Sequence, residues 1–220
     1  MIAVVDYHKG NLKSVERGLR YVGGEAFITD DPAHIAKAQA IVLPGVGAFA
    51  DAAQSMRALG QVEPLRSAVA AGVPFLGICL GFQLMYEEGT EGAPEEDDDM
   101  SSNNALGLAV LPGVVDRMPS TDAQGNLYKV PHVGWNTIEL VGDGGPLFAH
   151  IDSGEYFYFT HSFIAPESPC TTARTTHSIT FPCAAQYGDV AFGCQFHPEK
   201  SSDAGMTVLK TFLEIVKATG

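Results

Sequence analysis

The fold of this chain is decided around residues 74–83, which read PFLGICLGFQ. The apolar run over residues 74–78 is typical of a buried strand, and residues 82–88 have the pattern of a helix. Between them, Gly77 and Gly81 lie two residues before and two residues after Cys79. Glycines at these positions allow a turn so tight that it raises its central residue on strained backbone. The stretch therefore predicts a strand, a sharp turn at Cys79 and a helix.

The residues before this unit alternate between strand and helix in the same way. Strands are expected at 2–7, 26–29 and 40–43, and helices at 12–22, 49–59 and 64–71, with a short helix opening after Asp31-Pro32. Apolar strands separated by helices predict a parallel sheet that is covered on both faces.

The second half of the chain has a different pattern. Strands with turn residues between them are expected at 105–111, 128–140, 156–165, 170–177 and 182–196, and an amphipathic helix at 202–218. We therefore expect an α/β fold: a three-layer sandwich with a mostly parallel central sheet plus additional antiparallel strands. Because no linker is recognisable, residues 1–220 are expected to form a single domain.

The charge of the chain argues against two classes of partner. Its 220 residues include 26 acidic and 13 basic side chains, for a net charge of −13. Such a balance argues against a nucleic-acid backbone or an anionic membrane as the main partner. Eight of the acids fall in residues 87–99, of which Glu95–Asp99 is expected to be a solvated loop without chemistry.

The expected location and redox state of the protein rest on sequence signals that the chain lacks. Residues 1–11 lack the basic segment and apolar run of a signal peptide, and glycines interrupt the uncharged stretch Ser67–Tyr86. The four cysteines show no C-x-x-C spacing. We expect a cytoplasmic, reduced protein.

Two glycine-rich turns could carry the chemistry. Gly45–Ala50 fits the G-x-G-x-x-G/A pattern of dinucleotide-binding loops, but it follows the third expected strand and is preceded by Pro44. A nucleotide-binding module is thus one alternative. The other turn, at Cys79, fits two interpretations equally well. Cys79 is either a buried core cysteine or a nucleophile whose thiolate form is stabilised by the helix that follows.

The far end of the chain favours the nucleophile. His197 and Glu199 follow an expected strand, and side chains two residues apart share one face of an extended chain. A cysteine and a histidine supply a nucleophile and a base, and the carboxylate orients the imidazole. A metal site is not expected, because no second pair of ligands is clustered with these residues.

Six segments of the chain resemble the motifs of a known protein family. LPGVG (43–47), GICLGFQLM (77–85) and QFHPEKS (195–201) together resemble the three signature blocks of class I, triad-type glutamine amidotransferases. Asp6-Tyr7 with Gly10-Asn11, KVPHVGWN (129–136) and YFTHSF (158–163) resemble the glutaminase subunits of imidazole glycerol phosphate synthase. These segments span nearly the whole chain.

The resemblance implies a mechanism without a cofactor or a metal. Cys79 would attack the carboxamide of L-glutamine, His197 would act as base and then as acid, and Glu199 would orient His197. The oxyanion would be held by backbone of Leu80 and of Gly45, Val46 and Gly47. The substrate would be contacted by Gln83, Glu91, Ser162 and Phe163.

The resemblance also implies a partner, a (β/α)8-barrel cyclase subunit that forms a heterodimer with this chain. The cyclase subunit would receive the ammonia released from glutamine and use it in histidine biosynthesis. The implied interface residues are Asn11, His132, Trp135, Tyr158 and Lys200. Trp135 alone could equally be a core residue. The family usually has glycine where this chain has His8, so its N-terminal interface is expected to differ.

Two alternatives of the same class remain open at this point: the glutaminase partner of another synthase, such as anthranilate synthase, or a stand-alone γ-glutamyl hydrolase. Cys170, Cys183 and Cys194 match nothing functional and are read as structural. His34, His150 and His177 are read as surface residues.

Overall fold

A computed structural model of the chain describes residues 1–93 and 103–219. The acidic run Glu95–Asp99 lies outside the described residues. The centre of the structure is an eight-stranded sheet. In spatial order its strands are β2 (Ala26–Thr29), β1 (Ile2–Val5), β3 (Ala40–Leu43), β4 (Phe75–Ile78), β14 (Ala191–Cys194), β13 (Thr180–Tyr187), β12 (Thr171–Thr176) and β9 (Glu139–Leu140). The strands from β2 to β14 pair in parallel, and those from β14 to β9 pair antiparallel.

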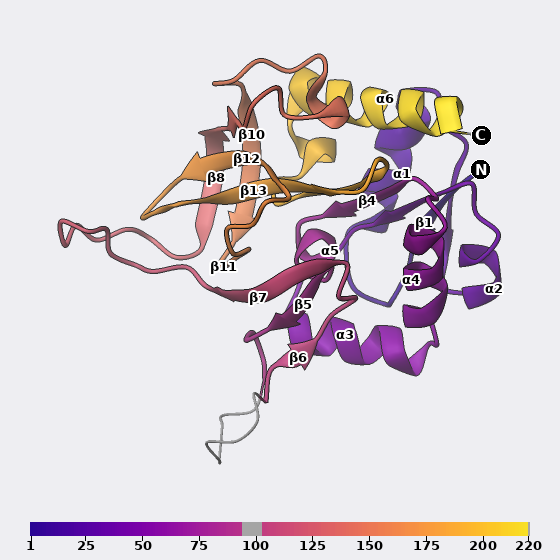
Figure 1. Cartoon of the computed structure of the whole chain (residues 1–220), viewed down its shortest axis with the longest axis horizontal. Helices are drawn as coiled ribbons and strands as arrows, with labels where there is room; N and C mark the ends of the chain where they lie inside the picture. The colour runs from indigo at the N-terminus through magenta and orange to yellow at the C-terminus, as the bar shows by residue number, and fades with distance from the viewer. Residues whose placement is uncertain (94–102, 220) are drawn as a thin grey trace.

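Helices cover both faces of this sheet (Figure 1). One face packs against α1 (Leu12–Tyr21) and α6 (Ser202–Thr219). The other packs against α2 (Pro32–Ile35), α3 (Phe49–Ala58) and α4 (Val62–Ala70). Because side chains alternate along a strand, β1 contributes Val4 to the first core and Val5 to the second. The predicted three-layer α/β fold is confirmed.

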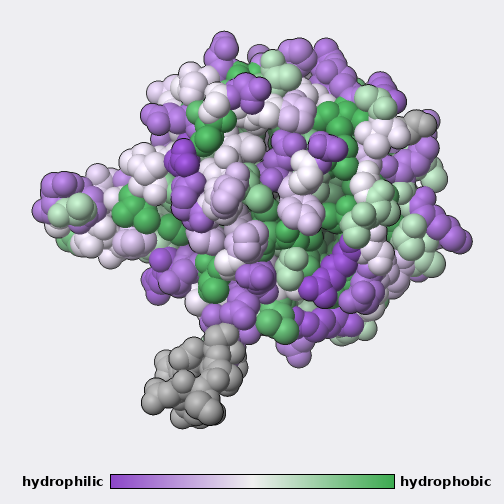
Figure 2. Space-filling view, viewed as in Figure 1, coloured by the Kyte–Doolittle hydropathy of each residue, from purple (hydrophilic) through white to green (hydrophobic). Residues whose placement is uncertain are grey.

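Two smaller sheets extend the molecule beyond the central sheet. The first contains β11 (Phe163–Ile164), β7 (Leu111–Arg117), β5 (Tyr86–Gly89) and β6 (Ala105–Leu106), in that order. The second pairs β8 (His132–Thr137) with β10 (Tyr156–His161). Residues 118–131, here called the arm, connect β7 to β8 and project from the body (Figure 1). Figure 2 shows hydrophilic and hydrophobic residues side by side on this projection.

The predicted helix over residues 82–88 is wrong. A four-residue helix, α5 (Leu80–Gln83), is followed after two turn residues by β5, which pairs with β6 on one side and with β7 on the other. A short apolar run does not distinguish a helix from a strand by its periodicity. Here the two strand partners decide the conformation.

Two other predicted strands have different bounds in the structure, for similar reasons. The strand expected over residues 182–196 is a hairpin of β13 and β14, which turns at Gly188 with φ +58°. The strand expected over residues 105–111 is short, and β7 begins where it was expected to end. Pro112 and Gly113 at the start of β7 concealed that strand, because both residue types weaken a strand pattern.

Candidate active site

The turn after β4 has the backbone geometry of a nucleophile elbow. Cys79 has φ +56°, a conformation that costs free energy for a residue with a side chain, and α5 begins directly after it. A Cβ at Gly81 would collide with the carbonyl oxygen of Leu43, and one at Gly77 would lie 2.8 Å from the carbonyl oxygen of Gly81. Both flanking glycines are therefore required by the crowding of neighbouring backbone.

Gly81→Ala is expected to destabilise the chain severely, by about 4 kcal/mol or more in the free energy of unfolding, because the methyl group has no space without moving β3. Urea denaturation measures this change. Gly72→Ala is the matched control: Gly72 has φ +76° and an open neighbourhood, so the expected cost is only about 1 kcal/mol. Equal costs for the two variants would contradict the crowding at the elbow.

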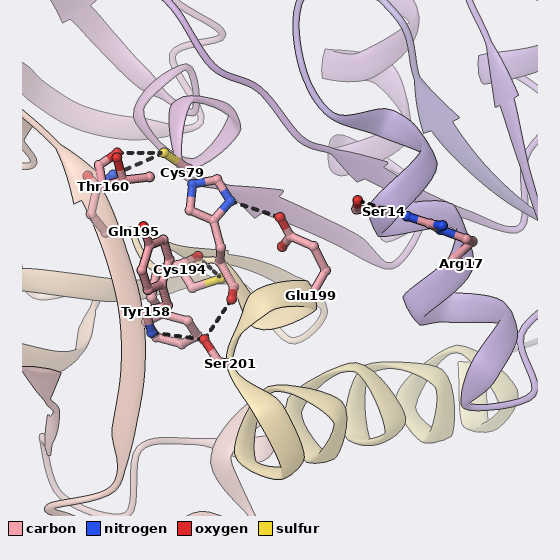
Figure 3. Close-up of polar contacts among 11 residues, drawn as sticks. Ser14, Arg17, Cys79, Tyr158, Thr160, Cys194, Gln195, Glu199 and Ser201 are labelled. Atoms are coloured by element: carbon pink, nitrogen blue, oxygen red, sulfur yellow. Dashed lines mark hydrogen bonds and ion pairs between the residues drawn. The ribbon is translucent and has the colours of Figure 1, made fainter. Parts of the chain in front are cut away.

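The sheet brings the far end of the chain to Cys79. Strand β14 lies parallel to β4 with Cys194 opposite Ile78, so residues 195–199 leave the sheet beside the elbow. His197 Nδ1 lies 2.9 Å from Glu199 Oε1, and both side chains are at least 96% buried. Figure 3 shows Cys79 and Glu199 in the same region of the site, and both groups act electrostatically on the His197 imidazole. The structure thus brings the three predicted catalytic side chains together.

The surroundings of His197 set its charge. Burial by itself lowers the pKa of the imidazole. Hydrogen bonds and negative charge from Cys79 and Glu199 outweigh this effect and raise the pKa of His197 to about 9. At neutral pH the ring is therefore protonated, which suits a group that must give a proton to a leaving amine.

Gln195 is a buried residue at the site for which the sequence predicted no role. Its Nε2 lies 3.7 Å from the Cys79 sulfur, and its Oε1 accepts a hydrogen bond of 3.0 Å from Gln83 Nε2. The carbonyl oxygen of Thr160 lies 3.9 Å from the same sulfur. The position of Gln195, two residues before His197 on the same extended segment, is the signal that could have identified it.

A cavity of about 370 Å³ opens at the sulfur. Its walls include most of the residues predicted to bind the substrate or its oxyanion: Val46, Gly47, Leu80, Gln83, Glu91, Ser162 and Phe163. Thr160 and His161, which had no predicted role, also line it. The elbow, the loop after β3 and the end of β10 thus meet around one cavity.

The wall nearest the elbow supplies backbone amides. Leu80 is the first residue of α5, and amides in a first helical turn have no partner within their helix. Across from it, Gly47 has φ +104° in open space. Gly45 is held against the hydroxyl of Tyr7, whose burial raises its pKa above the usual range. Of the predicted oxyanion residues, Gly45 thus lies in the packed base of the turn, whereas Val46 and Gly47 face the cavity.

Glu91 lies at the cavity and also caps a helix. Its Oε2 accepts a hydrogen bond of 3.2 Å from the Phe49 amide at the start of α3, and its backbone oxygen accepts another from Ala50. Burial raises the pKa of this carboxyl, and the Phe49 amide opposes the rise. A dinucleotide pyrophosphate would need these helix-start amides. Because both amides already donate to Glu91, one to its carboxylate and one to its backbone oxygen, the structure argues against the nucleotide-binding alternative at Gly45–Ala50.

Of the predicted interface residues, His132 is buried and the others are at least partly exposed. Trp135 and Tyr158 pair across β8 and β10, and the Nζ of Lys200 lies 5.9 Å from the Tyr158 ring. Trp135 is 53% exposed and Asn11 is also exposed, so Trp135 is not a core residue. His132 is different: it is only 4% exposed, because alternate residues of β8 point inward, and it cannot itself present a surface to a partner.

The remaining cysteines and histidines lie mostly as expected. Cys183 and Cys194 are buried in the core, and Cys170 is partly buried. The side chains of His34 and His150 are exposed, but His177 stacks on the buried ring of His132. Over residues 1–93 and 103–219, no group of three His, Cys, Asp or Glu side chains is arranged to hold a metal ion. Within the same ranges, none of the helices has the length and apolar character needed to cross a membrane.

The chain is similar to known proteins over nearly its full length. Residues 3–216 match the family model "Glutamine amidotransferase class-I". The chain is 45% identical to the imidazole glycerol phosphate synthase subunit HisH of Syntrophotalea carbinolica, with 96% of this chain and 98% of the relative covered. It is 42% identical to the subunit of that name from Moorella thermoacetica, with 100% and 97% covered.

Solved structures share the fold at low sequence identity. A crystal structure of a glutamine amidotransferase superposes with a TM-score of 0.71 at 20% identity, covering 99% of this chain and all of the other. The structure of PurLQS from Thermotoga maritima superposes with a TM-score of 0.69 at 17% identity, covering 97% of each chain.

Proposed function

This chain belongs to the class-I glutamine amidotransferases and, among them, to the family of the HisH subunit of imidazole glycerol phosphate synthase; from this premise we propose that it hydrolyses L-glutamine and supplies the ammonia to a cyclase subunit. The observation that carries the proposal is the convergence of Cys79, His197 and Glu199, with Cys79 in the wall of a cavity. The family match over residues 3–216 supports a single amidotransferase domain spanning 1–220.

The geometry supports a two-step reaction. The Cys79 thiolate, whose proton is on His197, attacks the side-chain carboxamide carbon of glutamine, and the tetrahedral oxyanion is held by the amides of Leu80 and of the Val46–Gly47 turn. His197, whose Nδ1 is engaged by Glu199, gives a proton from Nε2 to the departing nitrogen as the C–N bond breaks. Ammonia leaves, and a γ-glutamyl thioester remains on Cys79.

Water completes the reaction. His197 Nε2 takes a proton from a water molecule that attacks the thioester carbon, and the C–S bond breaks. Glutamate is released, and the Cys79 thiolate and the protonated His197 are restored. The cavity also suits the other end of the substrate: Glu91 supplies an anion for the ammonium group, and backbone of Ser162 and Phe163 supplies polar groups for the carboxylate. Gln83 also lines the cavity, and its side-chain amide donates to the backbone oxygen of Phe163 and to Gln195 Oε1.

The partner is a (β/α)8-barrel cyclase subunit, in a heterodimer that forms imidazole glycerol phosphate during histidine biosynthesis in the cytoplasm. The exposed side of β8 and β10 suits such a docking surface, because Trp135 and Tyr158 give it aromatic area and Lys200 gives it charge. The relatives that share this chain's full length carry the name of that synthase.

Glutamate release should depend on the partner. We expect hydrolysis of glutamine to rise at least about 10-fold when a purified barrel cyclase subunit and its ribonucleotide ligand are added, as for coupling between two sites. Glutamate is measured with and without each addition. Fast hydrolysis by the chain alone would favour a stand-alone γ-glutamyl hydrolase. Activation by the synthase subunit of a different pathway, and not by the cyclase, would favour the other amidotransferase alternative.

A further inference from the structure

Two buried histidines lie next to the cavity and have no part in the two-step reaction. His132 in β8 and His161 at the end of β10 face each other in the register of the two strands. They are 4% and 7% exposed, and His132 Nδ1 lies 3.2 Å from His161 Nε2. Two imidazoles in this arrangement form a hydrogen bond only if one nitrogen donates and the other accepts.

The direction of this hydrogen bond follows from its neighbours. His161 Nδ1 lies 2.9 Å from the carbonyl oxygen of Phe163, which can only accept, so Nδ1 carries the hydrogen and Nε2 is the acceptor. His132 Nδ1 therefore donates to His161, and His132 Nε2, at 3.3 Å, accepts from the Asn136 amide nitrogen. Burial lowers the pKa of His132 to about 4 and that of His161 to about 3, so both rings are neutral.

The ring of His132 is fixed in its plane by aromatic neighbours. It is stacked between Phe159, with ring centres 4.9 Å apart, and His177, with ring centres 4.3 Å apart. His177 is itself held by the backbone oxygen of Lys129, 2.8 Å from its Nε2. The hydrogen bond from His132 to His161 thus has a defined direction in space.

The other end of this chain of hydrogen bonds reaches the substrate wall. The Phe163 carbonyl also accepts a hydrogen bond of 3.0 Å from Gln83 Nε2, so two donors hold this peptide group. The Met118 amide donates to the Ser162 carbonyl, which places Phe163 and Arg117 at a non-hydrogen-bonded position of the antiparallel pair. The amide of Phe163 therefore points away from β7, to the same side as its carbonyl and toward the cavity.

We propose that His132 and His161 are positioning residues for glutamine: as neutral rings that each donate from Nδ1, they hold the turn His161–Phe163 so that its backbone meets the substrate carboxylate. This inference rests on the proposed function. His132 does not line the cavity, and its hydrogen bond to His161 is the contact through which its replacement is expected to affect substrate binding. Because the carboxylate is bound equally in the ground state and the transition state, the effect falls on KM.

Steady-state glutamate release by the complex with the cyclase subunit tests the proposal. His132→Leu should raise KM for glutamine by about 10-fold or more and change kcat by less than about 3-fold, since a buried acceptor is left unpaired. His132→Asn, whose amide keeps a donor near the place of Nδ1, should restore KM to within about 3-fold of the wild type. The exposed His150 provides the control variant His150→Leu, which should change neither parameter.

An unchanged KM in His132→Leu, or no rescue by His132→Asn, would overturn the proposal. Nitrogen-15 NMR of histidine-labelled wild-type protein at neutral pH gives an answer that is independent of folding of the variants. His161 and His132 should both be neutral with the hydrogen on Nδ1, and a hydrogen on Nε2 of His161 would refute the arrangement. If the wild-type complex released no glutamate, the proposed function would fail while the NMR result still decided the hydrogen-bond chain.

Discussion

Replacing Cys79 with alanine is expected to lower kcat for glutamine hydrolysis by at least about 10⁴-fold, because no other group at the elbow can form the thioester. The measurement is glutamate release by the complex at saturating glutamine. The folded state should survive, because the side chain of Cys79 is small and alanine accepts the same backbone with a similar strain. The loss should therefore be a loss of chemistry and not of structure.

Two controls distinguish a loss of chemistry from a loss of structure in Cys79→Ala. Cys170→Ala removes a partly buried free cysteine away from the cavity and should retain wild-type activity. The Cys79→Ala complex should still form the cyclase product when an ammonium salt replaces glutamine, since the partner then receives ammonia directly. Hydrolysis of glutamine by Cys79→Ala at the wild-type rate would remove the basis of the whole mechanism.

Replacing Glu199 with glutamine is the second change with a large expected effect. The carboxylate orients His197 and contributes to the raised pKa of its ring, which is about 9 in the folded protein. Without that charge, burial should lower the pKa of His197, so the ring loses its proton at a lower pH and cannot protonate the leaving ammonia. We expect kcat/KM to fall by about 10³- to 10⁴-fold, as when a triad carboxylate is replaced by its amide.

The pH profile distinguishes this effect from a general loss of structure. In the wild type, activity should decline as the pH rises through about 9, where His197 loses its proton. In Glu199→Gln the decline should begin at a lower pH. Glu214→Gln is the matched control, because Glu214 pairs with His150 at the surface at 3.7 Å and should change neither the rate nor the profile. A Glu199→Gln profile that coincided with the wild type would show that the carboxylate does not act through His197.

The sequence predicted the parallel half of the fold well, because β1, β3 and β4 are apolar on both faces and the helices between them have clear endings. It failed where pairing partners decide the conformation. Tyr86–Gly89 became a strand because β6 and β7 flank it, and those partners lie later in the chain. Local pattern carries no information about such contacts.

The candidate site was predictable to the extent that its chemistry is local. Cys79 was identified by its glycines, and His197 with Glu199 by their two-residue spacing. Gln195 and the pair of His132 with His161 were not, because their roles depend on distances between β8, β10 and β14 that no spacing along the chain records. The second role of Glu91, as a cap of α3, was missed for the same reason.

The proposed mechanism requires that Cys79 carry the glutamyl group during turnover. The most direct test is to mix the complex with glutamine, quench it with acid within the first turnovers, and determine the mass of the peptide that contains Cys79. We expect an adduct with the mass of one glutamyl group on that peptide and none on the peptides that contain Cys170, Cys183 or Cys194. Glutamate release without any such adduct, under conditions in which a thioester survives, would contradict the mechanism.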